Sequence, residues 1–556
     1  MKRDVAKLSS NTYDVIIIGA GIYGAWTAFD AALRGLSVAI VDKADFGSAT
    51  SSNTLKIIHG GLRYLQQADL RRMRQSIHER MVLMRVAPHL VHTLPFLTPT
   101  YGHFMKGKEI MYLALMINDF VSFDRNRLKD PDKYLPGGYI ISKDECLRLF
   151  PGVDEKGLTG GAIWYDCQMY NSERLLLSIL RSAEKAGANL ANYMEVIGFI
   201  KYGNRVTGVK TRDVITGEET HIRAKVIVNT TGPWVDYVLN LLNTDHRNHR
   251  VLLSKAMNLV IKRQLIPNYA VGISSRSEFK DDDSIIKKGP PLFFITPWHN
   301  RSLIGTTYAP YYGDPNNFKV SEEDIEIFIR EINQAYPPAS LRREDVSFFH
   351  GGLLPMDGNS GGNVRLSKKY RIRDHSEDGI EGLISVVGVK YTTARAVAAE
   401  TVELVFRKLG GEPPKCLTAI TPIHGGSIER FSDYLAEETE KKVRGFDTQV
   451  IQHLVYNYGS EYPEVLRSLD ENPEWGKTVD DASPVIKAEV LHGIREEMAQ
   501  KLTDVILRRT ELGSAGNPGD EALKTCALIM ARELGWNETR IQRELDETKA
   551  VFSAGV

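Results

Sequence analysis

Residues 13–24 read YDVIIIGAGIYG, and this stretch decides the fold. Its β-branched run at 13–18 is typical of a buried parallel strand, and three glycines follow it at short spacing. An alanine-rich helical pattern comes next, and a second strand pattern at 36–41 ends in Asp42. The order of strand, glycine turn, helix, strand and acid predicts a βαβ unit that binds a dinucleotide.

Each glycine of this turn has its own role in such a unit. Gly19 makes the tight turn, Gly21 lets the main chain approach a diphosphate, and Gly24 lets helix and strand pack closely. The helix N-terminus adds amide donors and a positive potential. Asp42, at the end of the second strand, can accept hydrogen bonds from the ribose hydroxyls of an adenosine.

The bulk composition sets broad limits on function. A chain of 556 residues is expected to form two or three domains, and its 42% apolar and 25% charged residues are typical of a folded protein. Seventy basic residues balance seventy acidic ones, so no global field indicates a nucleic-acid partner. The four cysteines form no CxxC pair, which predicts neither a metal site nor a disulfide framework and favours a reducing, cytoplasmic compartment.

The stretch 49–64, ATSSNTLKIIHGGLRY, brings hydroxyls, an amide, basic side chains, an imidazole and a glycine pair together. Hydroxyls and main-chain amides can bind phosphate oxygens, and adjacent glycines let the backbone lie flat against a ligand. Together with the N-terminal position of the glycine turn, this density favours FAD over NAD as the dinucleotide. A polar loop that only caps a helix is the alternative.

Within this stretch the sequence resembles the signature TSSxSSKLIHGGLRYL of the FAD-dependent glycerol-3-phosphate dehydrogenases. Further blocks of that family recur in the same order, with APHLV at 87–91, WYDCQ at 164–168, NTTGPWV at 229–235, IGTT at 304–307 and VVGVKYTTAR at 386–395. Short blocks between 488 and 510 resemble its helical cap. The resemblance covers almost the whole chain.

The resemblance implies a fold and an activity. The fold would be α/β, with a discontinuous Rossmann-like FAD-binding domain, an antiparallel-sheet substrate domain and a C-terminal helical cap domain. The activity would be oxidation of sn-glycerol 3-phosphate to dihydroxyacetone phosphate, in which C2 gives up a hydride to the flavin and a base accepts the hydroxyl proton. The electrons would pass to a membrane quinone or another acceptor.

Recurring strand patterns and glycine turns set the expected domain boundaries. We expect an oxidoreductase region at 12–425 and a helical domain at 426–556, where charged and apolar residues mix at helical spacing. The FAD-binding parts are expected at 12–100, 150–236 and 350–410, and the substrate-binding parts at 101–149 and 237–349. Strand-like runs at 257–261, 292–295 and 303–305 predict an antiparallel sheet that covers the flavin.

The motifs and the resemblance together nominate the residues that contact FAD and those that act in catalysis. The residues expected to bind FAD are Gly19, Gly21, Gly24, Asp42, Thr50, Ser51, Ser52, Lys56, His59, Gly60, Gly61, Val196, Thr231, Gly232, Gly388, Lys390 and Thr392. His59 and Lys390 are the candidate catalytic residues, because an imidazole titrates near neutrality and an ammonium can bind an anion. For His59, a hydrogen bond to the backbone or the cofactor is the alternative role.

A substrate phosphate calls for arginine or lysine, which supply charge and several donors. Lys255, Arg63 and Lys390 are therefore expected to bind the substrate, with Lys390 as the first choice. Thr307, in the IGTT block of the resemblance, is expected to bind it as well. Arg371 and Arg373 are further basic residues, although a basic residue outside a pocket is usually only solvated.

The chain departs from the family pattern at three positions. Leu354 stands where the family block GVRPL has arginine, Tyr308 where GTTD has aspartate, and Asn258 where a KGSH block has histidine. Two alternatives therefore remain open. The chain could be an FAD oxidoreductase for a different small hydroxy compound or an amine, or a weakly catalytic flavin-bearing protein that regulates or assembles others.

The stretch 104–117 combines two lysines with an apolar run. It could rest as a peripheral contact on the inner face of a membrane, or it could form a buried core helix. Its apolar run at 110–117 is too short to cross a bilayer. Formation of a homodimer is left open as well.

Overall fold

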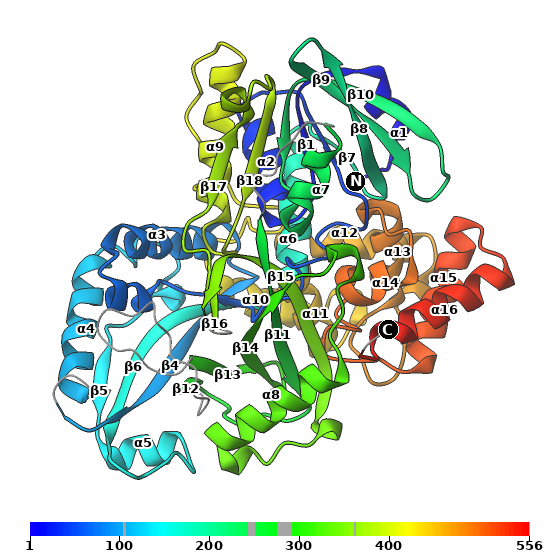
Figure 1. The fold of residues 1–556 in the computed structure, drawn as a ribbon. Coiled ribbons are helices and arrows are strands. Elements are labelled where there is room, and N and C mark those ends of the chain that lie inside the picture. Colours follow the sequence, from blue (N-terminus) through cyan, green and yellow to red (C-terminus); the bar gives the residue numbers. More distant parts are fainter. Residues whose placement is uncertain (104–106, 243–250, 275–291, 361–362, 555–556) are drawn as a thin grey trace.

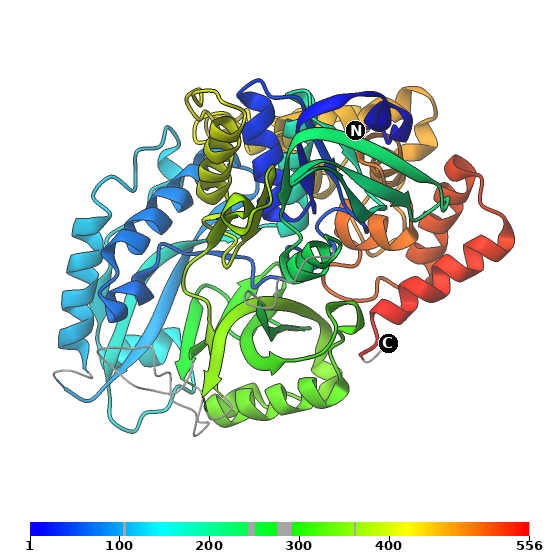
Figure 2. The ribbon, with the colours of Figure 1, turned by 45° about the horizontal axis from the view of Figure 1, so that its top comes forward.

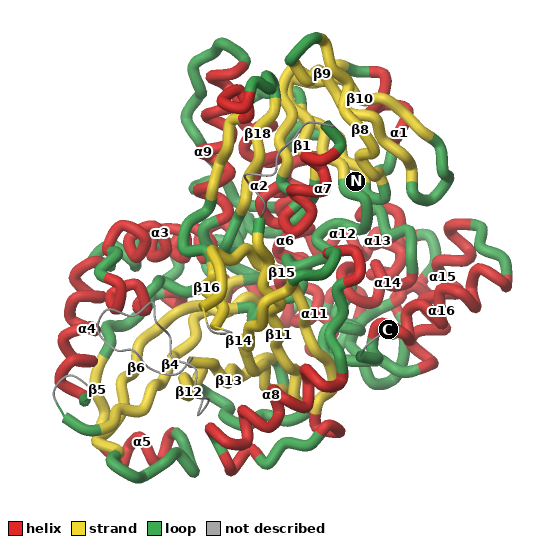
Figure 3. The backbone as a smooth tube through the Cα atoms, viewed as in Figure 1, coloured by secondary structure: helices red, strands yellow, loops and turns green. Residues whose placement is uncertain are grey.

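The computed structural model describes residues 1–103, 107–242, 251–274, 292–360 and 363–554. Two sheets form the body of the protein, and the C-terminal helices, coloured orange to red, pack beside them (Figure 1). The tube view shows strands concentrated in these two sheets and helices on their outer faces (Figure 3). The predicted α/β architecture with a helical C-terminal domain is confirmed.

The first sheet contains the predicted βαβ unit. Its main path runs β17-β18-β10-β1-β2-β7, and the strands from β18 to β7 are parallel. The hairpin of β8 and β9 extends β10 in antiparallel fashion. The strands are β1 (Thr12–Ile18), β2 (Val38–Val41), β7 (Asn189–Ala191), β8 (Met194–Tyr202), β9 (Arg205–Asp213), β10 (Glu219–Asn229), β17 (Arg371–Asp374) and β18 (Leu383–Val387).

Three helices cover one face of this sheet. Helix α2 (Ile22–Leu33) packs between α6 (Ser172–Lys185) and α9 (Ala394–Lys408). Beneath them the side chains of Val15 and Ile40 are fully buried, and each such burial stabilises the fold by roughly 1.5–3 kcal/mol. The opposite face is covered by α1 (Val5–Ser10), α7 (Val235–Asn240) and the β8–β9 hairpin. The strands are thus buried on both sides, as a β-branched run without alternation predicts.

The second sheet has the order β16-β15-β11-β14-β13-β12-β4-β6-β3, and β5 pairs with β6. Its pairs are antiparallel except β12 with β4. The three strand patterns predicted between 257 and 305 lie in β11, β13 and β14 and are confirmed. The strands are β3 (Ile57–Ile58), β4 (Val91–Tyr101), β5 (Tyr139–Ile141), β6 (Leu158–Met169), β11 (Leu252–Ile261), β12 (Ala270–Ser274), β13 (Leu292–Trp298), β14 (Arg301–Tyr311), β15 (Val346–Ser360) and β16 (Asn363–Leu366).

This second sheet includes more of the chain than the expected substrate-binding parts. β4, β6 and β15 overlap stretches that the sequence analysis assigned to FAD binding, yet all three belong to the antiparallel sheet. An apolar strand pattern shows that a segment is extended, but it does not show which sheet the segment joins. Helices α5 (Lys143–Leu149) and α8 (Glu322–Ala335) pack on this sheet and bury its outer apolar side chains.

The C-terminal region forms a helical domain with a core of its own. Its helices are α10 (Phe431–Glu440), α11 (Thr448–Tyr458), α12 (Tyr462–Leu466), α13 (Lys487–Glu497), α14 (Leu502–Asp504), α15 (Asp520–Leu534) and α16 (Glu538–Val551). A short π-helical turn, Val505–Arg509, follows α14 and ends in two arginines. Buried ion pairs join this domain to α6, among them Arg174 with Glu497.

Helix α4 (Lys108–Val121) lies beside α3 (Leu70–Val86) at the edge of the second sheet (Figure 1). Of its side chains only Leu115 is buried, whereas that of Phe120 is 82% exposed. Of the two alternatives left open for this stretch, the buried core helix is therefore excluded. The sequence could not decide between the two alternatives, because an apolar run of this length fits a core helix or a surface helix equally well. Residues 104–106 lie outside the described residues. Among those described, no helix combines the length and the hydropathy that crossing a membrane requires.

Candidate functional site

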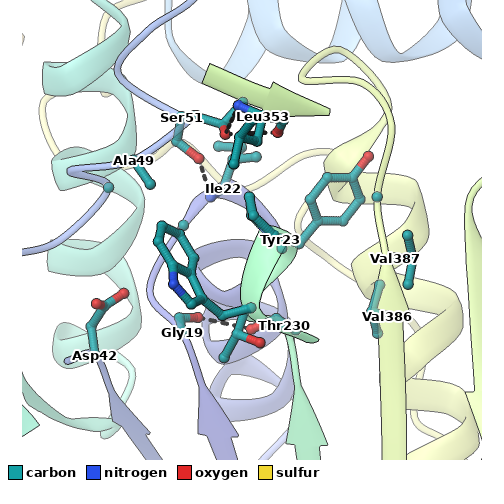
Figure 4. A pocket seen from close by; sticks show the side chains of 18 of the residues that line it. Gly19, Ile22, Tyr23, Asp42, Ala49, Ser51, Thr230, Leu353, Val386 and Val387 are labelled. Atoms are coloured by element: carbon teal, nitrogen blue, oxygen red, sulfur yellow. Dashed lines mark hydrogen bonds between the residues drawn. The ribbon is translucent and has the colours of Figure 1, made fainter. Parts of the chain in front are cut away.

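A cavity opens at the carboxyl ends of the parallel strands of the first sheet (Figure 4). It is lined by the glycine turn after β1, the acid after β2, the turn after β10 and the loop after β18. The second sheet contributes Leu353, Leu354 and Pro355 from β15. Ligands of open parallel sheets bind at this edge, because the loops after the strands converge there.

The glycine turn matches the shape that a diphosphate needs. Gly19 has a φ of +95°, and a Cβ on Gly24 would lie 1.9 Å from the carbonyl oxygen of Gly19, so neither position accepts a side chain. Gly21 precedes α2 and gives it no side-chain cap. The first turn of α2 therefore presents main chain to the cavity, where the helix dipole favours negative charge. Gly19 and Gly21 line the cavity, whereas Gly24 packs behind them.

Asp42 follows β2 and lies beside the glycine turn, at the end of the neighbouring strand (Figure 4). Its carboxylate accepts hydrogen bonds from the amides of Ala20, at 2.7 Å, and Ala44, at 3.0 Å. Burial still raises the pKa of this carboxyl to about 6. A buried acceptor of this kind fits the ribose hydroxyls of an adenosine. Val196, on β8, also lines the cavity.

The turn after β10 forms another side of the cavity. Thr231 and Gly232 line it, as the sequence analysis expected of cofactor-binding residues. The Thr230 hydroxyl donates to the carbonyl of Gly19, at 2.8 Å, and so fixes the glycine turn against this segment. Nearby, the Lys43 ammonium lies 4.1 Å from the ring centroid of Trp234, which is a cation–π contact.

The hydroxyl-rich loop divides between the cavity and the interior. Thr50 and Ser51 line the cavity, and the Ser51 hydroxyl accepts a hydrogen bond from the Ile22 amide at 3.0 Å. The Ser52 hydroxyl donates instead to the carbonyl of Gly47. Lys56 is fully buried and forms an ion pair with Glu173 at 2.8 Å. In this structure Ser52 and Lys56 thus stabilise the loop through contacts that lie outside the cavity lining.

The glycine pair of this loop packs against two side chains. A Cβ on Gly60 would lie 2.4 Å from the guanidinium of Arg80, and one on Gly61 would lie 2.4 Å from the ring of Tyr64. The His59 ring stands edge-on to Tyr64, with 6.2 Å between the ring centroids. These three loop residues lie next to the cavity and are not among the residues that line it.

Lys390 lies in the cavity wall on the loop after β18, as does Gly388. Its ammonium contacts the Tyr64 hydroxyl. The Tyr23 hydroxyl accepts hydrogen bonds from the amides of Val389 and Lys390, both at 3.0 Å, and donates to the carbonyl of Lys390 at 2.7 Å. Tyr23 thus fixes the loop that carries Lys390. Thr392 is buried behind this loop and does not line the cavity.

Sequence reasoning did not single out Tyr23, Lys43 or Trp234, although all three line the cavity. The signal for Tyr23 was its position, as the aromatic residue between Gly21 and Gly24 of the glycine turn. Lys43 and Trp234 gave no comparable signal, because their contact joins segments almost two hundred residues apart.

Two of the remaining substrate candidates, Lys255 and Thr307, are not among the residues that line the cavity. Lys255 forms an ion pair with Asp324 of α8, so a carboxylate already neutralises its charge. Thr307 pairs in register with Met257 in the second sheet. The side chain of Arg63 lies outside the described residues. Lys390 is therefore the candidate for anion binding that the structure places in the cavity wall.

The three departures from the family pattern occupy distinct places. Leu354 lines the cavity and presents an apolar side chain to it. The Asn258 side chain accepts a hydrogen bond from the Thr306 hydroxyl at 2.7 Å. Tyr308 lies on β14 and is 41% exposed.

The residues present fit FAD. Gly19 and Gly21 line the cavity in a turn of main chain, the first turn of α2 borders the same space, and a buried carboxylate stands at its edge, as the diphosphate and ribose of FAD require. Thr50, Leu354 and Lys390 line the same cavity as the glycine turn and Asp42.

Known proteins resemble this chain along its length. Residues 14–404 match the family described as FAD dependent oxidoreductase, and residues 416–541 match the C-terminal domain of alpha-glycerophosphate oxidase. A glycerol-3-phosphate dehydrogenase of a Synechocystis strain is 33% identical over 98% of this chain and 97% of its own length. A glycerol-3-phosphate dehydrogenase of Mycobacterium leprae is 30% identical over 99% and 90%.

A solved structure gives the same result for the fold. The glycerol-3-phosphate dehydrogenase from Bacillus halodurans complexed with FAD is 26% identical and has a TM-score of 0.77, with 99% of this chain and 96% of that chain covered. The expected cofactor, FAD, is confirmed together with the expected oxidoreductase class. The chain belongs to the FAD-dependent glycerol-3-phosphate dehydrogenase family.

Proposed function

We propose that this protein oxidises sn-glycerol 3-phosphate to dihydroxyacetone phosphate. The observation that carries the proposal is the full-length similarity to chains named glycerol-3-phosphate dehydrogenase, including both the oxidoreductase region and the helical domain. Bound FAD would accept the hydride from C2 of the substrate. The protein then has to orient that carbon, bind the phosphate and accept the hydroxyl proton.

Lys390 is the first residue to consider for these tasks. Its ammonium lies in the cavity wall, on a loop that Tyr23 holds by three hydrogen bonds. A fixed ammonium can bind the substrate phosphate or stabilise the alkoxide that forms as the proton leaves C2-OH. His59 lies beside Tyr64, which contacts Lys390, so it is the second candidate for proton transfer.

Anaerobic mixing tests the proposal. The purified holoprotein is mixed with glycerol 3-phosphate, glycerol or a series of 2-hydroxy acids, and the flavin absorbance is followed. We expect only glycerol 3-phosphate to bleach the flavin rapidly. Bleaching by another compound in the series, with none by glycerol 3-phosphate, would overturn the proposed substrate.

A second candidate is oxidation of a different small hydroxy compound or an amine by the same cofactor. It is favoured by Leu354, which gives the cavity an apolar side chain where the family pattern has an arginine. A substrate without phosphate would not need that guanidinium. A weakly catalytic flavoprotein is the third candidate, and a flavin that no compound in the series bleaches would support it.

The electron acceptor is proposed to be a membrane quinone, reached by peripheral contact through α4. The apolar side chains of this helix are exposed along most of its length, with Leu113 at 50%, Met116 at 53% and Phe120 at 82%. An exposed apolar helix face of this kind indicates a membrane or protein contact. A homodimer formed through the same face is the alternative occupant.

A further inference from the structure

Two loops form the end of the cavity at Asp42. The first, residues 42–45, follows β2, and the second, residues 191–194, joins β7 to β8. Asp42, Lys43 and Ala44 of the first loop and Met194 of the second line the cavity. The loops are bonded to each other, since the Met194 amide donates to the carbonyl of Asp42 at 2.7 Å. We call them the Asp42 loop and the Asn192 loop.

The helical domain binds the Asp42 loop through a buried carboxylate. Asp45 is the last residue of that loop, is 1% exposed and points away from the cavity lining. The Arg509 guanidinium donates two parallel hydrogen bonds to its carboxylate, each of 2.7 Å. The Arg508 guanidinium donates to the same carboxylate at 2.5 Å. Both arginines lie in the π-helical turn of the helical domain.

The same part of the helical domain binds the Asn192 loop. The Asn192 amide nitrogen donates to the carbonyl of Met498 at 2.8 Å and to the Asp45 carboxylate at 3.0 Å. The Tyr193 hydroxyl donates to the carboxylate of Asp504 at 2.7 Å. Asp504 in turn accepts a hydrogen bond from Arg508 at 2.8 Å. Residues 498–509 therefore contact both loops through one connected buried network.

Such a network holds the loops in one arrangement. A bidentate guanidinium–carboxylate pair fixes distance and angle together, and a buried charge left without its partner is strongly unfavourable. The loops can therefore move apart only if the network breaks. We propose that the helical domain retains the adenosine half of FAD through Asp45, Arg508 and Arg509, which act as positioning residues without lining the cavity.

Thermodynamic linkage extends the proposal. If docking of residues 498–509 favours the loop arrangement that binds FAD, then bound FAD favours that docking by the same factor. FAD should therefore protect amides of the helical domain that never touch it. This consequence does not depend on which alcohol the enzyme oxidises.

The first experiment measures FAD release. Holoprotein is diluted and the recovery of free-flavin fluorescence is followed for Asp45→Asn, Arg508→Lys and Arg509→Lys. The matched control is Arg181→Lys, because Arg181 of α6 is similarly buried and binds Glu464 and the carbonyl of Glu496 across the same domain interface, whereas its described hydrogen bonds and ion pairs reach neither loop. We expect FAD release to accelerate at least ~10-fold in the three network variants and to stay near the wild-type rate in the control.

The comparison separates positioning from general stability. Each variant's melting temperature is measured beside its release rate, and the control is expected to lose a similar number of degrees without faster release. Equal acceleration in all four variants would mean that any weakening of the interface releases FAD, and it would overturn the specific role. Unchanged release in the three network variants would overturn the proposal outright.

The second experiment uses the wild-type protein and therefore needs no variant to fold. Hydrogen–deuterium exchange of residues 498–509 is compared between apoprotein and holoprotein. We expect FAD to slow exchange there about 10-fold, and to have no such effect on residues 431–440 of α10, which pack on α11. Exchange at 498–509 that ignores FAD would contradict the linkage on which the proposal rests.

Discussion

At the scale of the residue, Leu354 is the position that most directly tests substrate choice. It lines the cavity on β15, whose neighbouring carbonyl at Leu353 accepts a hydrogen bond from the Thr50 hydroxyl at 3.0 Å. A hydrogen bond to a charged group contributes about 1.5–3 kcal/mol. We therefore expect Leu354→Arg to raise kcat/KM for glycerol 3-phosphate roughly 10- to 100-fold, mainly through KM, with glycerol unaffected.

Steady-state rates with an artificial electron acceptor measure this effect. Leu354→Met serves as the control, because it changes shape without adding charge. Equal changes for glycerol 3-phosphate and glycerol would show that Leu354 does not lie near the phosphate.

We expect Asp42 to make FAD binding depend on pH. Burial raises the pKa of its carboxyl from about 3.9 in an unfolded chain to about 6 in the apoprotein. The buried carboxylate therefore lowers apoprotein stability above pH 6, and this loss is relieved as the pH falls from 6 towards 4. Ribose hydroxyls donate to the ionised form, so below pH 6 binding must also remove a proton.

We accordingly expect the FAD dissociation constant to rise as the pH falls from 7 to 5, by up to about tenfold per unit below 6. Fluorescence titration of apoprotein with FAD at several pH values measures it. Asp42→Asn should bind more weakly and show a flat profile over this range. An unchanged slope in that variant would assign the pH dependence to another group.

At the scale of the element, α4 carries the membrane prediction. Phe120 is 82% exposed on this helix, and burial of a phenyl side chain contributes roughly 1.5–3 kcal/mol. Phe120→Glu should therefore weaken binding to anionic vesicles at least ~10-fold in a sedimentation assay. Tyr202→Glu is the control, because Tyr202 is 84% exposed on β8, at the opposite sheet. If Phe120→Glu instead abolishes a dimer in size-exclusion chromatography, the α4 face is a contact between two copies.

The elements also show which structural features could be predicted from sequence patterns. The strand before Gly19, the acid after β2 and the strand at 383–387 were predictable, because each depends on neighbours in the chain. The assignment of β4, β6 and β15 to the second sheet was not, because strand pairing joins residues far apart in sequence. The exposure of α4 was likewise undecided, since the presence of a covering element cannot be read from the helix itself.

At the scale of the whole molecule, the residues of the candidate functional site were predictable only where a local motif identifies them. Gly19, Gly21, Asp42 and Lys390 were predictable from motifs and do line the cavity. Lys56 was nominated from its place in the hydroxyl-rich loop, yet its side chain is buried in an ion pair with Glu173. Residues whose role depends on a distant partner, such as Asp45 with Arg508 and Arg509, carry no local signal at all.

The arrangement of the whole molecule predicts its orientation on a membrane. Both ribbon views place α4 and the C-terminal helices α15 and α16 at opposite ends of the protein (Figures 1 and 2). Contact through α4 would therefore leave the helical domain facing water. Two exposed leucines provide matched probes, Leu113 on α4 at 50% and Leu528 on α15 at 52% exposure. Three of the native cysteines are buried, which keeps background reaction with a thiol reagent low.

Maleimide labelling of Leu113→Cys and Leu528→Cys, with and without anionic vesicles, measures the orientation. An apolar face in the acyl boundary is shielded from a water-soluble reagent, so vesicles should slow labelling at position 113 roughly tenfold or more. Labelling at position 528 should keep its rate. Equal slowing at both positions would indicate adsorption without a preferred face, and slowing at 528 alone would place the helical domain on the membrane. Either result would contradict the proposal that the protein reaches a quinone through α4, because a quinone in the bilayer is accessible only from the protein face that contacts the membrane.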